Sequence, residues 1–381
     1  MVEIDRPYWR RRVDEAWKKA PIVWLAGVRR VGKTTLAKSI PGVRYLNCDL
    51  PSTVELLADP ERFLRSLNRG TVVLDEIHQL DDPSRVLKIV ADEFPGLRIL
   101  ATGSSTLAAV GKFRDSLAGR KRVVHLLPVL AGELTAFGVA DLRKRLHHGG
   151  LPAALLGDAP APDLYAEWLD SYFARDVQEL FSVSKRTAFL TLVELLLRQS
   201  GGLAEITKLA AATGLSRPTV MSYLEVVEVT QVATLLRPFH HGGRQELTHQ
   251  PKIYAFDTGF VAWSRGWNEL RPPDLGQLWE HVVLETLQAE VIGEGRRVHF
   301  WRDKQQREVD FVVPANRGAV HAIECKWSTQ GFETRGLGAF RAEHPRGRNL
   351  LVVPGESTRE RTFGDLVVTI TSVEALPTLL D

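Results

Sequence analysis

The chain has 381 residues, 44% of them hydrophobic and 25% charged, which is typical of a globular protein with two or three domains. The formal net charge of +3 means that any contact with nucleic acid must come from a local basic surface. The two distant cysteines exclude a disulfide framework and a cysteine-based zinc site. With no apolar signal core and no run near the roughly 18 apolar residues that span a bilayer, we expect a cytoplasmic protein without a membrane partner.

The first elements of the chain predict a nucleotide site. Residues 8–19 have the spacing of a basic amphipathic helix, which can lie near a nucleotide base or simply be a solvated helix. The apolar run 22–26 predicts a buried strand. Residues 27–34, GVRRVGKT, then match the phosphate-loop pattern G-x-x-x-x-G-K-[ST], and a helix-forming run follows over 35–39.

The residue types of this loop suit phosphate chemistry. Glycines allow backbone N–H groups to turn around phosphate oxygens, and the helix N-terminus adds partial positive charge. Lys33 can reach the β and γ phosphates, and the Thr34 hydroxyl can ligate Mg²⁺. We therefore expect ATP and Mg²⁺ as cofactors. The expected nucleotide contacts are Gly27, Arg30, Gly32, Lys33, Thr34 and Thr35.

A second part of the nucleotide site is predicted further along the chain. A strand over 43–47 and a helix over 53–67 precede the apolar strand 71–74, which ends in Asp75 and Glu76. Asp75 would hold Mg²⁺, mostly through water, opposite Thr34. Glu76 would polarise the attacking water. Together with Lys33, these carboxylates are the expected catalytic groups.

Two further polar segments have open alternatives. Residues 102–105, TGSS, close a strand over 97–101 and can sense the γ-phosphate or form an ordinary turn. Arg120 precedes a strand over 123–126. It can act as an arginine finger on a neighbouring subunit's nucleotide, or it can form a structural salt bridge.

The middle of the chain predicts a winged helix-turn-helix. A proline-rich break over 157–163 precedes helices over 164–181 and 185–199. Helices over 203–213 and 217–229 flank a Gly214 turn and a Ser216 cap. Residues 232–256 then form two strand-like arms around HGGR, as in a hairpin wing.

Such a module most often binds DNA, and the exposed side of its second helix would enter a groove. The expected contacts are Arg217, Thr219, Ser222 and Tyr223 in the groove and Arg244 on a phosphate. Glu225 and Glu228 on the same helix would repel phosphates. A role as a lid or protein-interaction module therefore remains open.

The last part of the chain predicts an α/β domain with an acidic site. After a break over 271–276 come a helix over 278–291, strands over 297–301, 308–313, 319–326, 350–353 and 366–370, and a charged loop over 354–362. Glu280, Asp310, Glu324 and Lys326 match the PD-(D/E)xK nuclease pattern, in which carboxylates gather Mg²⁺ and the lysine orients water. A domain that retains these residues but only binds DNA or joins subunits is the alternative.

Several motifs in order resemble the prokaryotic AAA+-like ATPases that carry a C-terminal PD-(D/E)xK-like domain of unknown function. The motifs are GVRRVGKTT, TVVLDEIH, LATGSS, SLAGRKRVVHLLPV, HGGLPAAL, DSYFARDVQEL and YAFDTGF. The resemblance covers essentially the whole chain. It implies a parallel-sheet ATPase core, a helical lid and assembly into a homo-oligomer such as a hexameric ring. It also implies that Arg175 and residues 149–152 lie near the lid and sense nucleotide.

We therefore expect an α/β protein of four parts. They are a P-loop AAA+-like core over 1–140, a helical lid over 141–200, a winged helix-turn-helix over 201–270 and a nuclease-like domain over 271–381. The expected function is ATP hydrolysis coupled to DNA binding and remodelling, for example of branched duplexes, with metal-dependent cleavage as an open addition. The alternative is a nucleotide-controlled switch in signalling or transcription, with a non-cleaving nuclease-like domain.

Overall fold

The computed structural model describes residues 4–67, 69–103, 117–178, 181, 183, 185–239, 250–291 and 295–380. The chain divides into two compact units. Unit 1 comprises Met1–Leu127, Glu167–Ser184 and Val229–Gln231, and unit 2 comprises Pro128–Ala166, Lys185–Glu228 and Val232–Asp381. Among the helices of the described ranges, none is long and apolar enough to cross a membrane.

Unit 1 is built on a parallel sheet of five strands in the order β2-β3-β4-β1-β5. The strands are β1 (Ile22–Ala26), β2 (Val43–Asn47), β3 (Gly70–Asp75), β4 (Leu97–Thr102) and β5 (Lys121–His125). Every residue of β1 is buried, as expected for a strand near the middle of a sheet covered on both faces. The expectation of a parallel-sheet core is confirmed.

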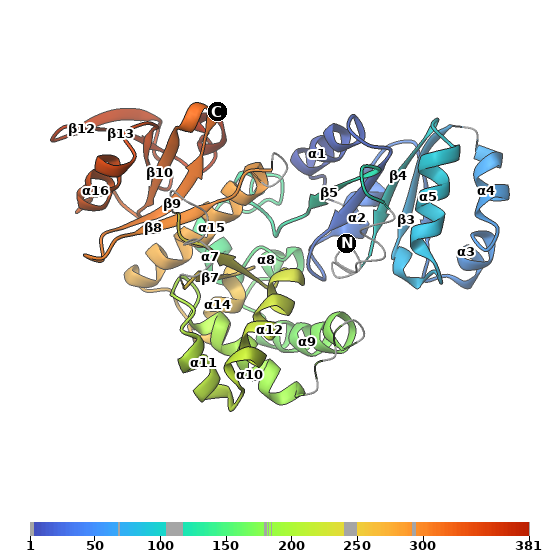
Figure 1. The fold of residues 1–381 in the computed structure, drawn as a ribbon, viewed down its shortest axis with the longest axis horizontal. Coiled ribbons are helices and arrows are strands. Elements are labelled where there is room, and N and C mark those ends of the chain that lie inside the picture. Colours follow the sequence, from blue (N-terminus) through green and yellow to red (C-terminus); the bar gives the residue numbers. More distant parts are fainter. Residues whose placement is uncertain are drawn as a thin grey trace. The chain divides into compact units, whose positions relative to one another are not determined.

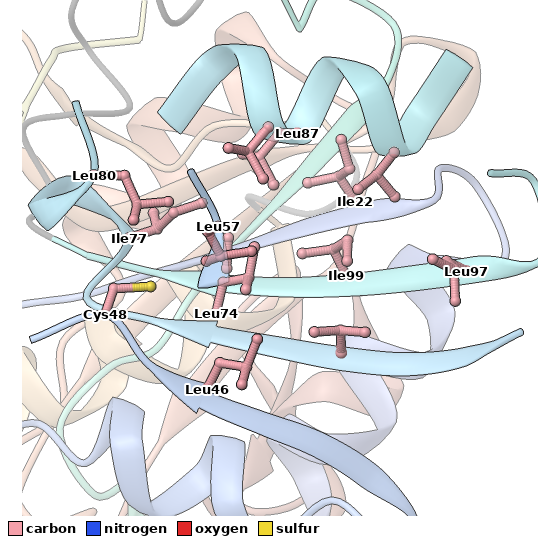
Figure 2. Close-up of a cluster of buried hydrophobic side chains, with 14 of the residues drawn as sticks. Ile22, Leu46, Cys48, Leu57, Leu74, Ile77, Leu80, Leu87, Leu97 and Ile99 are labelled. Carbon is pink, nitrogen blue, oxygen red and sulfur yellow. The ribbon is translucent and has the colours of Figure 1, made fainter. Parts of the chain in front are cut away.

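Helices pack against this sheet (Figure 1). α1 (Pro7–Trp17) packs against β1 and β5, α2 (Lys33–Ser39) against β2, β3 and β4, and α5 (Pro83–Glu93) against β4. In Figure 2, buried side chains of the strands and of the helix that carries Leu87 meet in one apolar layer. This layer fixes the strand ends from which the polar residues of the site project.

The expected helix over 53–67 is wrong, because two helices occupy that stretch. They are α3 (Pro51–Leu56) and α4 (Pro60–Leu67). Pro60 has no backbone N–H to continue a helix, and its ring disfavours the helical conformation for Asp59. Proline is instead well suited to the first turn of a new helix, which is where the structure places it.

Unit 1 also includes Glu167–Ser184 from the middle of the chain, a stretch that begins within α9 (Pro162–Tyr172). The helix continues directly into a π-helical turn, Phe173–Val177, with the Gln178 N–H donating to the Phe173 carbonyl at 2.9 Å. The rings of Trp168 and Tyr172 stack with centroids 5.4 Å apart. The Tyr172 hydroxyl shares a 2.8 Å hydrogen bond with Thr230. This segment is therefore anchored within unit 1.

In unit 2, the structure contains the helices and the two strands that the sequence indicates between 185 and 256. They are α10 (Arg186–Arg198), α11 (Ile206–Thr213), α12 (Arg217–Val229), β6 (Ala233–Leu236) and β7 (Lys252–Ala255). Gly214 adopts a φ of +66° in the turn, and the Ser216 hydroxyl accepts the Thr219 N–H at 3.3 Å. β6 and β7 are antiparallel. Arg244, the expected phosphate contact, lies outside the described residues.

One residue of α12 differs from the expectation. Tyr223 is buried and packs edge-to-face on Phe189, with ring centroids 5.2 Å apart, so it does not face a groove. It lies on the helix face of Val220, Leu224 and Val227, which the 3.6-residue period turns into the core. Arg217 and Ser222 are exposed, and Thr219 is half-buried.

The C-terminal part of unit 2 is a mixed sheet of six strands in the order β12-β13-β11-β10-β9-β8 (Figure 1). The strands are β8 (His299–Arg302), β9 (Glu308–Pro314), β10 (Val320–Cys325), β11 (Asn349–Val352), β12 (Arg359–Phe363) and β13 (Leu366–Thr371). α15 (Pro272–Val291) packs against β10, and α16 (Arg335–Glu343) packs against β9. Unit 2 also contains α7 (Leu142–His148), α8 (Pro152–Leu156) and α14 (Thr258–Ser264).

Two expectations for this region are wrong. The stretch 271–276, expected as a break, mostly belongs to α15, because Pro272 and Pro273 occupy first-turn positions where a missing N–H costs nothing. The stretch 354–362, expected as a loop, includes most of the exposed edge strand β12. An edge strand can be charged because one side of it faces water.

Candidate functional site

The phosphate-binding loop connects β1 to α2 in unit 1. Gly27 and Gly32 have φ values of +151° and +102°, and a Cβ on Gly27 would lie 2.6 Å from the Leu126 carbonyl oxygen. Lys33 Nζ donates to the carbonyl oxygens of Gly27 at 2.7 Å and Val28 at 3.0 Å. Burial lowers the pKa of Lys33. The ammonium is thus held inside the loop by backbone oxygens.

Asp75, the last residue of β3, joins three parts of unit 1. Its Oδ2 accepts hydrogen bonds from the Thr34 hydroxyl at 2.8 Å and from the Tyr45 hydroxyl at 2.6 Å. Its Oδ1 accepts the Thr102 hydroxyl at the end of β4. Burial, together with the Asp75 carboxylate, raises the pKa of Tyr45, so the phenol stays a donor. Three donors therefore fix the orientation of one carboxylate.

Glu76 follows with a φ of +54°, a left-handed conformation that is unusual for a residue other than glycine. Its N–H donates to the Thr102 hydroxyl oxygen at 3.1 Å, and its Oε2 lies 3.2 Å from His78 Nδ1. His78 is the main cause of a lowered Glu76 pKa, which Lys33 also favours and burial opposes. An ionised carboxylate of this kind can accept a proton from water.

The remaining residues expected at the nucleotide lie in or beside the loop. Arg30, with a φ of +61°, pairs with Glu167 at 2.6 Å on the surface. Thr35 is exposed in the first turn of α2. Hydroxyl and carboxylate oxygens are ligands that Mg²⁺ prefers, and Thr34 and Asp75 place one of each side by side. The residues present therefore fit a magnesium ion.

Arg120 is not brought to this loop by any contact that the structure shows. Its guanidinium pairs with Asp92 at 2.6 Å on a partly exposed surface, which is the geometry of the salt-bridge alternative. A finger role toward another subunit stays a prediction. In the TGSS segment, Thr102 is fully buried on Asp75, whereas residues 104 and 105 lie outside the described ranges.

The segment 149–152 surrounds a buried aspartate in unit 2. Asp257 Oδ2 accepts the N–H groups of Gly150 at 2.6 Å and Leu151 at 3.1 Å. A Cβ on Gly149 would lie 1.9 Å from Asp257 Oδ1, so only glycine fits there. The contacts between the HGGLPAAL and FDTG stretches thus account for the glycines of the first and the aspartate of the second. Nucleotide sensing by this segment and by the exposed Arg175 stays a prediction.

Three of the four residues of the nuclease-like pattern meet in unit 2. Lys326 Nζ lies 3.2 Å from Glu324 Oε2 and 3.7 Å from Asp310 Oδ2. Asp310 also accepts the Cys325 N–H at 2.8 Å. Burial and Asp310 raise the pKa of Glu324 well above its usual value. Burial opposes the charge on Lys326, but the two carboxylates outweigh it and raise the pKa of Lys326.

Glu280, the fourth residue, accepts the Tyr254 hydroxyl at 3.1 Å. Burial and the Asp310 charge raise the pKa of Glu280 to about 8. Lys252 of β7 pairs with Glu308 and adds a second cation to the cluster. Within the described ranges, no group of three or more His, Cys, Asp and Glu side chains is placed to hold a metal ion. Metal binding at Glu280, Asp310, Glu324 and Lys326 therefore stays a prediction.

Sequence reasoning missed four residues that contact these sites: Tyr45, His78, Lys252 and Tyr254. His78 follows Glu76 by only two positions, so its proximity could have been noticed. Tyr45 reaches Asp75 because β2 and β3 are neighbours, and Lys252 and Tyr254 reach their partners because β7 lies near α15 and β9. No local sequence pattern predicts these three contacts.

Three family models match successive parts of the chain. Residues 19–135 match a family described as AAA domain. Residues 139–271 match a domain of unknown function, DUF8612, and residues 275–374 match another, DUF4143. The AAA match covers the strands and the loop that carry Lys33, Thr34, Asp75 and Glu76.

Several known proteins are similar to this chain. An uncharacterized protein of Mycobacterium tuberculosis is 28% identical over 99% of this chain and 88% of its own length. An uncharacterized protein of Methanocaldococcus jannaschii is 24% identical over 75% of this chain and 70% of its own. The solved structure of a Walker-type ATPase of Pyrococcus abyssi covers 69% of this chain and 96% of its own, with 15% identity and a TM-score of 0.44.

The AAA match and the parallel sheet agree on one assignment for the first part of the chain. Unit 1 carries a P-loop ATPase domain of the AAA type, a class that binds nucleotide and usually Mg²⁺. The expectation of an AAA+-like ATPase is confirmed at this level.

Proposed function

We propose that the chain hydrolyses ATP through Lys33, Thr34, Asp75 and Glu76 and couples hydrolysis to the binding and remodelling of DNA, such as branched duplexes. The observation that carries the hydrolysis is the fixed Asp75 carboxylate, which accepts the Thr34 hydroxyl at 2.8 Å and directly precedes the ionisable Glu76. These adjacent carboxylates support a magnesium position at Asp75 and a proton acceptor at Glu76.

Each residue of the nucleotide site would have a separate role in hydrolysis. Lys33 would leave its carbonyl partners to bind phosphate oxygens. Thr34 and Asp75 would hold Mg²⁺, which neutralises charge on the phosphates when it is bound. Glu76 would orient a water and accept its proton, and the lowered pKa keeps this carboxylate ionised near neutral pH. Thr102 would fix the orientation of the Asp75 carboxylate and the position of the Glu76 backbone through its two hydrogen bonds.

The DNA part of the proposal is supported by α11, α12 and the β6–β7 hairpin. The Ser216-capped α12 begins with the exposed Arg217, and Ser222 is exposed further along the helix. These side chains can donate hydrogen bonds to phosphates or bases. Because the net charge is only +3, binding should depend strongly on salt.

The first experiment is steady-state ATP hydrolysis with Mg²⁺, alone and with single-stranded, duplex and four-way DNA. Lys33→Ala serves as the blank, and native mass measurement reports whether the chain forms a ring or another homo-oligomer. Stimulation by one form of DNA, absent in Lys33→Ala, is the expected result. Hydrolysis that ignores every DNA would contradict the coupling while leaving the ATPase assignment intact.

A second candidate is a nucleotide-controlled switch in which α12 contacts a protein. Met221 is 57% exposed on α12, and Glu225 follows one turn later, so this helix face combines an apolar and an acidic residue. Such a face suits a protein partner better than a phosphate backbone. The switch predicts slow turnover, no response to DNA and a change of mass between ADP and a non-hydrolysable triphosphate.

Metal-dependent DNA cleavage by the C-terminal domain is a separate part of the proposal. It is supported by the convergence of Asp310, Glu324 and Lys326, with Lys326 placed between the two carboxylates. If Mg²⁺ binds there, it should raise the melting temperature of the wild type but not that of Asp310→Ala. Asp365→Ala, an exposed aspartate of the same domain, is the control. Equal shifts in all three proteins would exclude a site at Asp310.

A further inference from the structure

We propose that Arg29 contacts the γ-phosphate of a bound nucleoside triphosphate, and that Asp176 of the π-helical turn holds Arg29 until the triphosphate replaces it. This inference rests on the proposed ATP binding in unit 1, and it names a second cation of the site besides Lys33. The phosphate-loop pattern leaves the identity of position 29 open, so the pattern itself does not predict this role.

α9 and the π-helical turn that follows it both contact the middle of the phosphate-binding loop. The Trp168 indole N–H donates to the Arg29 carbonyl oxygen at 3.0 Å. Arg29 Nη1 lies 3.7 Å from Asp176 Oδ2. The neighbouring pair of Arg30 and Glu167 adds a third link at 2.6 Å. The loop that would hold the phosphates is therefore joined at two consecutive residues to the middle of α9 and to the turn that follows this helix.

The charges around the loop alternate in sign. Arg29 is near enough to Lys33 and Glu76 to influence the pKa values of both, and Asp176 acts on Lys33 as well. The Arg29 guanidinium therefore acts electrostatically on the lysine that would bind the β and γ phosphates and on the glutamate that would direct the water. Arg29 is itself a residue of the phosphate-binding loop, so its side chain belongs to the segment that would surround the phosphates.

Asp176 differs in burial from the carboxylates that pair with Arg30 and Arg120. The Asp176 side chain is almost completely buried, with 6% of it exposed, whereas the Glu167 partner of Arg30 is 67% exposed and the Asp92 partner of Arg120 is 33% exposed. A buried carboxylate holds its cation more strongly than an exposed one. A terminal phosphate offers more charge and several oxygens to a planar guanidinium, so it can outcompete a single carboxylate.

The backbone around Asp176 offers a way for the exchange to be transmitted. A π-helical turn is rare and is frequently found at functional sites, and here it contains Asp176. Loss of the Arg29 contact would release one of the links that join this turn to the loop. The exchange therefore couples the presence of the γ-phosphate to the π-helical turn. A diphosphate lacks the γ-phosphate, so it would leave Asp176 paired with Arg29.

The test compares the affinities for ATPγS and ADP, both with Mg²⁺, by calorimetry on the full chain. In Arg29→Ala we expect the ATPγS affinity to fall by about tenfold or more and the ADP affinity by less than about threefold. Asp176→Asn, which removes the competing charge with little change in shape, should raise the ATPγS affinity by about twofold to fivefold. Arg65→Ala, which removes an arginine paired with Glu61 on α4, is the matched control and should change neither affinity.

The outcomes separate this inference from the proposed function. If Arg29→Ala loses both affinities equally, or keeps the wild-type preference for ATPγS, Arg29 has only a structural role and the inference is overturned. If Arg29→Ala unfolds, Arg29→Lys and Asp176→Asn decide: unchanged ATPγS-to-ADP ratios in both would overturn it. Failure of the wild type to bind either nucleotide would instead remove the proposed ATP binding on which the inference depends.

Discussion

The Thr34 hydroxyl donates a 2.8 Å hydrogen bond to Oδ2 of Asp75, which ties the start of α2 to the end of β3. The two residues are 41 positions apart. They meet because β3 is separated from β1 only by β4 and all three strands are parallel, so their carboxyl ends share one edge of the sheet. The Thr102 hydroxyl closes the arrangement from β4.

Glu76→Gln should bind ATP but hydrolyse it about 10² to 10⁴ times more slowly than the wild type, because a carboxamide cannot accept the proton of the attacking water. Single-turnover hydrolysis together with ATP binding will measure the two effects separately. A variant that hydrolyses ATP at the normal rate would show that another group is the proton acceptor.

Thr102→Val should reduce kcat by about tenfold with little change in ATP affinity, because the hydroxyl holds both the Asp75 carboxylate and the Glu76 N–H. Valine has nearly the same shape, so packing in the sheet is retained. Thr71→Val at the other end of β3 is the control and should be silent. Equal rates for the two variants would exclude a positioning role for Thr102.

Gly149→Ala should strongly destabilise unit 2. The added Cβ would lie 1.9 Å from Asp257 Oδ1 in a residue with a φ of +78°, so both steric overlap and backbone strain act against folding. We expect a loss of roughly 4 kcal/mol or more in the free energy of unfolding.

Gly138→Ala separates these two causes. Gly138 has a φ of +68°, and apart from its two neighbours no described residue lies within 4 Å of the position that an added Cβ would occupy. It should cost only about 1 kcal/mol, the cost of the left-handed conformation. Chemical denaturation followed by tryptophan fluorescence will measure both variants. Similar losses would mean that the contact with Asp257 contributes nothing.

Glu280 should make the stability of unit 2 decrease as pH rises. Its folded pKa of about 8 lies above the value near 4.3 expected in the unfolded chain. The folded state therefore binds more protons than the unfolded state between these values, and stability falls across that window, by at most ~1.4 kcal/mol per pH unit from this group. Between pH 5 and about pH 8, the melting temperature of Glu280→Gln should fall less steeply with pH than that of the wild type. Equal slopes in the two proteins would refute the raised pKa of Glu280.

Arg217→Ala should weaken DNA binding without changing hydrolysis in the absence of DNA, because Arg217 is exposed at the start of α12. If it contacts a phosphate, the slope of log affinity against log salt should decrease by about one. Titration of labelled duplex at several salt concentrations measures this slope, with Arg65→Ala as the control. An unaltered slope would favour a protein partner for α12.

Local pattern was sufficient for the elements whose signal is short in range. The phosphate-binding loop, the strand that ends in Asp75 and Glu76, and the Ser216-capped α12 were each predictable, because glycine geometry, apolar runs and capping act over a few residues. The errors are also local. Pro272 suggests a break in the chain, and Pro60 is easily overlooked as the start of a new helix. In both cases the structure places the proline in the first turn of a helix, with which proline is compatible.

The sequence alone determined that this protein has a phosphate-binding loop with two carboxylates at the end of a later strand, since these motifs are contiguous and depend on local backbone chemistry. Only the tertiary structure decided which distant side chains surround them. Tyr45 reaches Asp75 because β2 and β3 are neighbours, Asp176 reaches Arg29 from the π-helical turn after α9, and Tyr223 is buried in the core. Such contacts depend on packing between segments far apart in the chain, which no local pattern encodes.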